Sequence, residues 1–104
     1  MIWIISGTQD GREIGAALAD REQSKPEGER REILMTVVSQ YGKVLAAHKG
    51  LDIEVGRFRE EDMLRVIAEK GISLILDASH PYAAIVSETA RAACTKAGID
   101  YVRY

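Results

Sequence analysis

Residues 2–13 read IWIISGTQDGRE and decide the fold class of this chain. The apolar run at residues 2–5 predicts a buried strand, and a Ser-Gly-Thr turn ends it. A helix is expected from Asp10, with Asp10 as its N-cap and Glu13 three residues further on. A strand that leads through a glycine-containing turn into a helix places free backbone N–H groups at the positive end of the helix dipole. Such a turn binds a phosphate-sized anion, so a nucleotide is the first ligand to consider.

The composition indicates one ordinary globular domain over residues 1–104, with 46% hydrophobic and 29% charged residues. The formal net charge of −2 gives no general attraction to nucleic acid or to an anionic membrane, so neither is expected as a partner. The single cysteine, Cys94, excludes an internal disulfide and is typical of a reducing cytoplasm. A strand directly after Met1 leaves no room for a signal peptide, and the apolar runs are too short to span a bilayer. We therefore expect a cytoplasmic protein.

Apolar runs and helical patterns alternate along the chain. Strands are expected at residues 2–5, 33–38, 53–55, 73–76 and 101–102, and helices at residues 10–21, 41–48, 60–69 and 83–97. The polar stretch 22–32 contains Pro26 and Gly28, and it is expected to be a surface loop and a candidate for disorder. Continuous apolar strands that alternate with helices predict a parallel sheet covered on both faces. The fold class is therefore α/β: a Rossmann-like, doubly wound, mainly parallel sheet of about five strands with helices on both faces.

The ligand crevice of such a sheet lies at the carboxyl ends of its strands. Gly7 and Gly11 lie at one of these ends, but they have the spacing G-x-x-x-G and not the dinucleotide fingerprint G-x-G-x-x-G. Two glycines that only allow a tight turn are therefore an open alternative to phosphate binding. After the second strand, Ser39 and Gln40 stand where NAD-binding sites usually have an acidic residue, which favours NADP at least as much as NAD.

A second candidate motif is LDASHPYA at residues 76–83. Pro81 restricts His80 to an extended conformation, which fixes the direction of the imidazole at the end of a strand. Asp77, three residues upstream, is placed to orient or charge that imidazole. A ligand-binding or proton-donating histidine is one interpretation, and a partly buried histidine in a plain connector is the other. No metal site is expected, because His48 is the only other histidine in the sequence and Cys94 falls in a predicted helix.

Four segments together resemble the precorrin-6A reductase family of cobalamin biosynthesis, which includes the cobalt-precorrin-6A reductases. They are SGTQDGRE (6–13), TVVSQYG (36–42), DASHPYA (77–83) and AGIDYVRY (97–104), and the resemblance covers the whole chain except the charged loop 22–32. The resemblance implies NAD(P)H-dependent reduction of a macrocycle double bond in a tetrapyrrole, precorrin-6A or its cobalt form. It also implies two Rossmann-like domains, with substrate and nicotinamide meeting in the cleft between them.

Members of this family are much longer than this chain. The resemblance is therefore to their N-terminal domain, and it implies that a C-terminal domain is absent here. Either the chain is a truncated product or a separate polypeptide supplies the other half, and catalysis by this chain alone is not expected. The family usually has Gly-Gly-Thr where this chain has Ser6-Gly7-Thr8, which is a mild change in a turn lined by backbone.

The resemblance also implies roles for individual residues at the strand ends. The expected contacts of NADPH or NADH are Gly7, Thr8, Asp10, Gly11, Arg12, Thr36 and Ser39. The expected contacts of the substrate are Tyr41, Gly42, Ser79, His80, Ser87 and Arg91. The expected catalytic residues are His80 and Tyr82. Lys43, Arg57 and Arg59 are further candidates for pairing with substrate carboxylates, and a solvated surface role is the alternative for each.

A second class of function stays open at this point. A non-catalytic Rossmann-type module that binds a nucleotide or associates with another chain would have the same strands and turns. An exposed last strand favours association into a homo-oligomer, because an unpaired sheet edge can pair with another chain.

Overall fold

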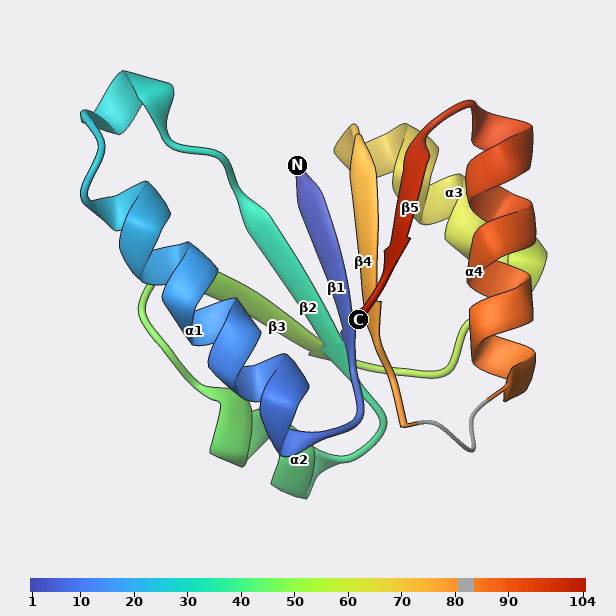
Figure 1. Cartoon of the computed structure of the whole chain (residues 1–104), viewed down its shortest axis with the longest axis horizontal. Coiled ribbons are helices and arrows are strands. Elements are labelled where there is room, and N and C mark those ends of the chain that lie inside the picture. The colour runs from blue at the N-terminus through green and yellow to red at the C-terminus, as the bar shows by residue number, and fades with distance from the viewer. Residues whose placement is uncertain (81–83) are drawn as a thin grey trace.

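The computed structural model describes residues 1–80 and 84–104 as five strands that alternate with helices (Figure 1). The strands are β1 (Ile2–Ser6), β2 (Ile33–Val37), β3 (Leu51–Val55), β4 (Leu74–Ala78) and β5 (Asp100–Arg103). The helices are α1 (Gln9–Gln23), α2 (Gln40–Ala46), α3 (Glu60–Lys70) and α4 (Ala84–Ala97), with a short 3₁₀ turn, η1 (Glu27–Glu29).

The strands form one parallel sheet in the order β3-β2-β1-β4-β5. The chain builds outward from β1 to β3 on one side and then crosses back to place β4 on the other side of β1. The point where the strand order reverses therefore lies between β1 and β4, and ligands of doubly wound sheets bind at the carboxyl ends of the strands beside such a point. The predicted fold class is confirmed.

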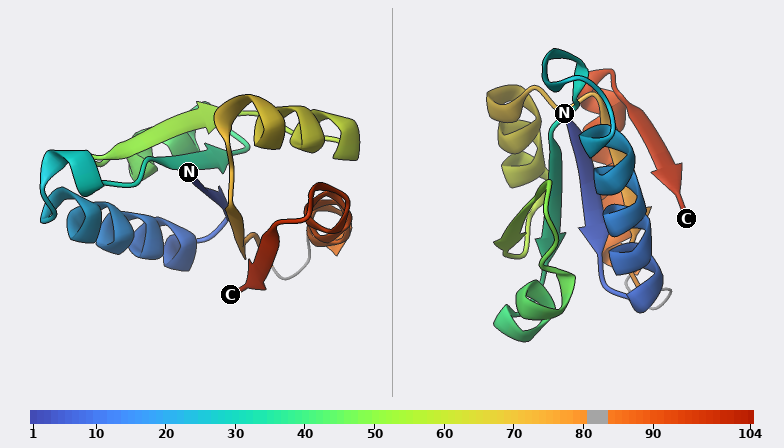
Figure 2. Two further views of the ribbon diagram at one scale, coloured as in Figure 1. Left: turned by 90° about the horizontal axis from the view of Figure 1, so that it is seen from above. Right: turned by 90° about the vertical axis from the view of Figure 1, so that its left-hand side faces the viewer.

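Alternate residues of β1 supply the two cores of the molecule. Trp3 and Ile5 pack with α3 and α4, while Ile2 and Ile4 pack with α1 and α2. Figure 2 shows α1 and α3 on opposite sides of the twisted sheet. All five residues of β1 are buried, because the strand is covered on both faces.

Helix α1 begins before the residue expected from the sequence. Its N-cap is Thr8, whose extended backbone leads into the helix and whose Oγ1 accepts a hydrogen bond of 3.1 Å from the backbone N–H of Gly11. The prediction of Asp10 as the N-cap is wrong. Asp10 lies in the first turn instead, where a carboxylate also stabilises the positive end of the helix.

Residues 24–32 form a mostly exposed connection that contains the short turn η1, which confirms the predicted surface loop over most of its length. Helix α1 continues to Gln23, and the side chain of Glu22 is buried at its end. One carboxylate oxygen of Glu22 accepts from the Nζ of Lys25 at 2.8 Å, and the other accepts from the backbone N–H of Arg31 at 2.7 Å. Together with η1, these bonds fix the return of the chain to β2.

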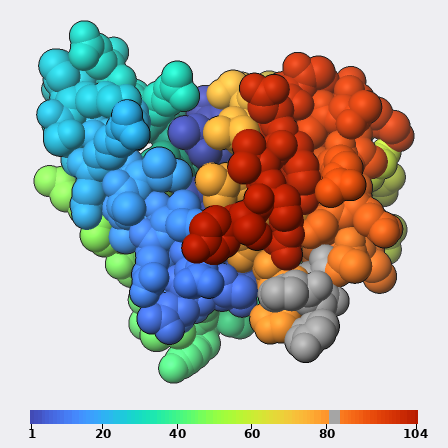
Figure 3. Space-filling view, viewed as in Figure 1, coloured from blue at the N-terminus to red at the C-terminus, as the bar shows by residue number. Residues whose placement is uncertain are grey.

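Other element bounds differ from the prediction by a few residues. Helix α2 covers Gln40–Ala46 where 41–48 was expected, β2 ends at Val37, and β4 extends to Ala78. Strand β5 lies uncovered on the face shown in Figure 3. Over the described ranges, no helix is both long and apolar enough to cross a membrane.

Candidate functional site

The carboxyl ends of β1, β2 and β4 meet at one edge of the sheet, beside the first turns of α1 and α2 (Figure 1). This carboxyl edge contains most of the predicted site residues. It divides into a polar cavity on the α1 and α2 face, an apolar cavity on the α3 and α4 face, and a buried carboxylate cluster at the end of β4.

The turn after β1 packs directly against the end of β4. The backbone N–H of Gly7 donates to the carbonyl oxygen of Ala78 at 3.4 Å, and the Oγ1 of Thr8 donates to the same oxygen at 3.4 Å. A Cβ added to Gly7 would lie only 3.1 Å from the backbone nitrogen of His80. Gly7 therefore permits the close approach of the two loops that form the centre of the edge.

The backbone N–H groups of the turn are less free than the sequence suggests. Those of Gly7 and Gly11 already donate to Ala78 and to Thr8. Gln9 and Asp10 occupy the first two helical positions, where a backbone N–H has no acceptor within the helix. Helix geometry leaves these two N–H groups to acceptors outside the helix, such as an anion.

Gly11 is buried against the sheet and does not line the polar cavity. A Cβ at this position would meet the Oγ of Ser6 at 2.7 Å and the Cβ of Ala78 at 3.1 Å. The absent side chain lets α1 approach the ends of β1 and β4. Gly11 thus allows the start of α1 to lie close to the sheet, and its predicted contact with the cofactor stays a prediction.

The polar cavity has a volume of about 220 Å³ and brings five predicted site residues together. These are Gly7, Arg12, Ser39, Tyr41 and Gly42, and the remaining lining residues are Ser6, Val37, Val38 and Leu45. We call this space the polar lobe. Its charged side chain is Arg12, which lies in the first turns of α1 next to the positive end of that helix. This arrangement favours an anion.

The opposite wall of the polar lobe is the start of α2. The Oγ of Ser39 caps this helix by accepting a hydrogen bond of 3.0 Å from the backbone N–H of Gly42. Tyr41 stands out from the first turn with 65% of its surface exposed. Ser39 and Gly42 therefore build the wall, while the Tyr41 side chain is free to contact a bound molecule.

The apolar cavity opens at the same edge on the other face of the sheet and has a volume of about 90 Å³. We call it the apolar lobe. Its lining residues are Trp3, Ile5, Ser6, Thr36, Val37, Val38, Gly56, Arg57, Phe58, Met63 and Val86. Thr36, a predicted cofactor contact, is buried here, and its Oγ1 accepts a hydrogen bond of 2.9 Å from the indole Nε1 of Trp3.

The carboxylate of Asp77 is fully buried at the end of β4. Its Oδ1 accepts from the backbone N–H of Ser79 at 3.0 Å and from the Oγ of Ser79 at 2.6 Å, and its Oδ2 accepts from the hydroxyl of Tyr101 at 2.6 Å. The guanidinium of Arg103 donates to Oδ1 at 3.1 Å and to the carbonyl oxygen of Ser79 at 2.9 Å. These bonds tie β5 to the loop that carries His80.

Hydrogen bonding keeps the Asp77 carboxylate charged. Burial raises the pKa of this carboxyl group, but the hydrogen bonds from Ser79, Ser87 and Tyr101 outweigh burial, and the net pKa lies below its usual value. The pKa of the Tyr101 phenol is raised, first by burial and then by its hydrogen bond to the negatively charged Asp77.

The described contacts of Asp77 reach the loop after β4 and strand β5, and its predicted effect on the His80 imidazole stays a prediction. The two Asp77 oxygens accept hydrogen bonds from Ser79, Tyr101 and Arg103, and the Ser87 hydroxyl adds a further hydrogen bond. The sequence did not suggest Tyr101 or Arg103. The parallel pairing of β4 and β5 in the structure places Asp77 opposite Arg103, and the sequence alone does not reveal this register.

The remaining predicted site residues lie around this cluster. The Oγ of Ser87 on α4 is 3.4 Å from that of Ser79, and the guanidinium of Arg91 lies 5.4 Å from the ring centre of Tyr101. Ser87 and Arg91 therefore share a face of α4, and that face is turned toward the ends of β4 and β5. His80 is exposed at the edge. Tyr82 lies outside the described residues.

Four further charged candidates have solvent-exposed side chains. Asp10, Lys43, Arg57 and Arg59 all have exposed side chains, and Arg57 stands at the mouth of the apolar lobe. Asp10 adds a negative charge beside the N–H groups that the first turn offers. This charge offsets part of the attraction that the helix terminus has for an anion.

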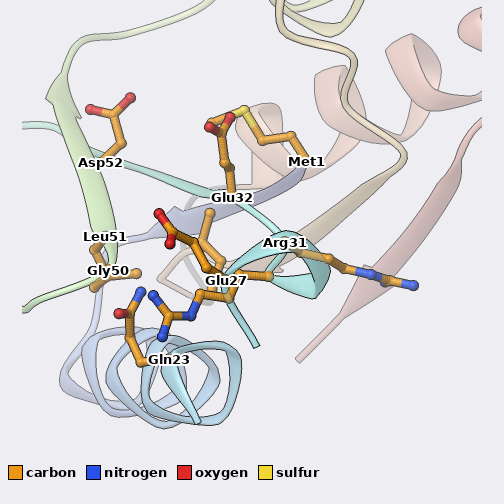
Figure 4. Close-up of a pocket in the computed structure, with 10 residues that line it drawn as sticks. Met1, Gln23, Glu27, Arg31, Glu32, Gly50, Leu51 and Asp52 are labelled. Atoms are coloured by element: carbon orange, nitrogen blue, oxygen red, sulfur yellow. The ribbon is translucent and has the colours of Figure 1, made fainter. Parts of the chain in front are cut away.

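A larger hollow lies at the opposite end of the sheet. It has a volume of about 590 Å³ and is lined by residues from the end of α1, from segment 27–33 and from the start of β3 (Figure 4). Arginine and glutamate side chains share its walls, including Glu27, Arg31 and Glu32. Because it lies at the amino ends of the strands, where doubly wound sheets do not bind their ligands, we assign no site to it.

The comparison that decides the family concerns the whole chain. The family model described as precorrin-6x reductase CbiJ/CobK matches residues 1–104. The chain belongs to the precorrin-6x reductase family. The resemblance inferred from the four sequence segments is thereby confirmed.

Individual relatives agree with this assignment. The chain is 33% identical over 104 residues to the cobalt-precorrin-6A reductase of Priestia megaterium, covering 100% of this chain and 38% of the relative. The cobalt-precorrin-6A reductase of Synechocystis sp. is 29% identical over 104 residues, covering 99% of this chain and 37% of the relative. The chain thus spans well under half the length of these precorrin-6x reductase relatives.

A solved structure supports the fold. The structure described as CobK precorrin-6A reductase superposes with a TM-score of 0.74 at 22% sequence identity, and it covers 99% of this chain and 38% of that one. At this identity the likeness concerns the Rossmann-like architecture alone. It agrees with the sheet order and the helical layers described above.

Proposed function

We propose that this chain is the Rossmann-like part of a precorrin-6A or cobalt-precorrin-6A reductase, in which it binds NADPH or NADH and forms one wall of the tetrapyrrole site. Membership of the reductase family supports the reaction class. The observation that carries the cofactor assignment is the polar lobe, where Arg12 lies beside the positive end of α1 and opposite the cap of α2.

The polar lobe suits a phosphate group of the dinucleotide. The N–H groups of Gln9 and Asp10 and the guanidinium of Arg12 supply donors and positive charge. Ser39 and Gln40 follow β2 and bring no acidic side chain to that strand end, which is compatible with the 2′-phosphate of NADPH. Asp10 and Glu13 are exposed negative groups on either side of Arg12 in the sequence, so they limit the strength of anion binding.

A bound nicotinamide would supply the hydride for the macrocycle double bond. The residues of this chain would then bind the substrate and deliver a proton from the same edge. His80 is exposed there, directly after the buried Ser79, and Tyr82 follows it in the sequence. We assign proton delivery to these two side chains, and we assign substrate contacts to Tyr41 and to the loop held by Asp77.

The complete reaction requires more polypeptide than this chain. The two cobalt-precorrin-6A reductases compared above are matched over 38% and 37% of their length. Most of each of these reductases therefore lies outside the part that this chain matches. We propose that a second, C-terminal half supplies the rest of the cleft. The buried free Cys94, which forms no disulfide, agrees with a cytoplasmic setting for this reaction.

The test begins with titration of the purified chain with NADPH and with NADH, followed by reduction of cobalt-precorrin-6A. The assay is repeated after addition of the remaining polypeptide of the Priestia megaterium relative. Cofactor binding by the chain alone and turnover only with the added polypeptide are expected. Cofactor binding without turnover in either assay would favour a non-catalytic nucleotide-binding module. Absence of cofactor binding, even with the added polypeptide, would contradict the proposal.

A further inference from the structure

Part of the sheet is uncovered on the face where α1 lies. Helix α1 packs against β1, β2 and β3, whereas α3 and α4 lie on the opposite face. Strand β5 packs with β4 and α4, and Figure 3 shows it uncovered beside α1. Four side chains of β4 and β5 form this uncovered part, which we call the open face: Leu74, Leu76, Asp100 and Val102.

A single row of side chains shows where the helical cover ends. Ile4, Leu76 and Val102 are paired in register on three neighbouring strands, so their side chains lie side by side on one face. Ile4 is fully buried in the core under α1, Leu76 is partly buried, and Val102 is 48% exposed. The preceding residue, Tyr101, packs with the core on the opposite face. The cover therefore ends at β4.

The open face has the dimensions of one helix. Parallel sheets are normally covered on both faces, so an exposed apolar row on such a sheet indicates an absent layer. Two neighbouring strands are about 10 Å wide at the usual strand spacing. An α-helix with its side chains has a diameter of about 10–12 Å, and packed helices lie about 8–10 Å apart. One further helix beside α1 therefore fits the open face.

The longer relatives indicate the origin of such a helix. The chain matches 38% and 37% of the two cobalt-precorrin-6A reductases compared above, so most of each lies outside the matched part. Tyr104 directly follows β5, and its backbone N–H donates to the carbonyl oxygen of Asp77 at 2.9 Å. Polypeptide that continues from residue 104 in a reductase therefore starts beside the open face.

We propose that the open face binds an amphipathic helix of about three turns from the C-terminal part of a reductase. Three turns span about 16 Å, which is the length of a strand of five residues such as β4. The apolar side of this helix packs on Leu76 and Val102. The proposal rests on the proposed function, because its partner is the rest of the reductase. A strand paired with the free edge of β5 is a different arrangement, since it would leave Leu74 and Leu76 uncovered.

Thiol modification distinguishes these arrangements. Residues 1–104 are studied alone in dilute solution, and also joined in one chain to the remaining polypeptide of the Priestia megaterium reductase. Leu74→Cys and Val102→Cys probe the open face, and Ala68→Cys, at an exposed position on α3, is the control. We expect the joined chain to slow modification at both probe positions by about tenfold or more and to leave the control unchanged, because a covered thiol reacts only when the cover opens. Peptide mass mapping separates these thiols from Cys94.

The outcomes separate the proposal from the proposed function. Protection of both probe positions supports the proposal. Protection of Val102→Cys alone indicates a strand at the edge of β5 and overturns it. Reduction of cobalt-precorrin-6A by the joined chain without protection of Leu74→Cys also overturns it and leaves the proposed function intact. A joined chain that neither binds NADPH nor reduces the substrate contradicts the proposed function, and absence of protection in that chain contradicts this proposal as well.

A second measurement needs no substitution. Hydroxyl-radical footprinting of the two unsubstituted proteins reports the exposure of the Leu76 and Val102 side chains directly. Both side chains should be oxidised several-fold more slowly in the joined chain. Equal oxidation rates in the two proteins would overturn the proposal even if a cysteine variant does not fold.

Discussion

Asp77 is a fully buried carboxylate that the surrounding residues keep charged. Its hydrogen bonds come from the loop after β4 and from two residues of β5, Tyr101 and Arg103. A buried charge with this many donors stabilises one arrangement of the segments it joins. The position of Ser79 and the start of the His80 loop therefore depend on a strand that is distant in sequence.

We expect Asp77→Asn to lower the free energy of unfolding at neutral pH by about 2–3 kcal/mol, the range for hydrogen bonds to a charged group. The pKa of Asp77 is lowered in the folded state, so its contribution is present above the unfolded pKa of about 3.9 and is lost as the pH falls through the lower folded value. Urea unfolding at several pH values measures this. The difference from wild type should shrink in acid, and the exposed control Asp52→Asn should show little change. A loss that does not depend on pH would contradict the assignment.

The atoms around Gly11 leave no space for a side chain at this position. A methyl group here would meet Ser6 at 2.7 Å and Ala78 at 3.1 Å, so we expect Gly11→Ala to destabilise the fold by about 1–3 kcal/mol. In an open helix the same change would stabilise, because alanine has the higher helix propensity. Gly28→Ala is the matched control, since nothing lies within 4 Å of a Cβ at that position. Thermal unfolding distinguishes the two cases, and a stabilised Gly11→Ala would show that α1 does not approach the sheet as described.

Cys94 is buried in the core between the sheet and α4, and burial raises the pKa of its thiol to about 11. The thiolate is the reactive form, so we expect very slow modification by a thiol reagent at pH 8 and rapid modification in guanidinium. Spectrophotometric titration of the thiol tests this, with the unfolded chain as its own control. Rapid modification of the native chain would mean that α4 does not cover this residue.

The start of α1 illustrates what the sequence can predict about an element and what it cannot. Apolar spacing predicts the helix and the strand before it, and the structure confirms both. Thr8 and Asp10 are both good N-cap residues, so local sequence does not choose between them. The choice depends on the end of β4, because Ala78 accepts hydrogen bonds from Gly7 and Thr8 and thereby fixes where the helix begins.

This difference leads to a test at the level of the helix. Thr8→Ala removes the side chain that accepts from Gly11 and should cost about 1 kcal/mol, whereas Thr8→Ser should restore most of that stability. Asp10→Asn should cost less, because Asp10 contributes only through the helix dipole. Chemical denaturation of the three variants gives the order. If Asp10→Asn lowers the free energy of unfolding more than Thr8→Ala does, Asp10 and not Thr8 is the N-cap of α1.

The two lobes and the carboxylate cluster could not be predicted from the sequence, because each combines residues from segments that are distant in the chain. The apolar lobe combines the ends of β1 and β2 with the loop after β3 and one residue of α4, and nothing in the sequence marks these as neighbours. The carboxylate cluster depends on the register of β4 with β5. The sequence predicted the edge of the sheet that holds these features, because the carboxyl ends of parallel strands meet there.

At the scale of the whole molecule, β5 lies at an edge of the sheet and carries exposed apolar surface. Val102 in this strand is 48% exposed, and Tyr104, directly after the end of the strand, is 66% exposed. An unpaired edge strand is a template for another chain, so we expect the isolated 104-residue chain to self-associate. Light scattering should give a mass above that of the monomer, and Val102→Lys should shift the chain toward the monomer. A concentration-independent monomer would contradict this expectation.

Cavities lie at both ends of the sheet, so the cofactor has two alternative places to bind. The larger hollow lies at the amino ends, and the two smaller lobes lie at the carboxyl ends. Titration of the ¹⁵N-labelled chain with NADPH, followed through its backbone amide signals, decides between them. Shifts concentrated at Gly7, Arg12, Ser39 and Gly42 are expected. Shifts confined to Gln23, Glu32 and Asp52, or none at all, would contradict the assignment of the cofactor site to the carboxyl edge.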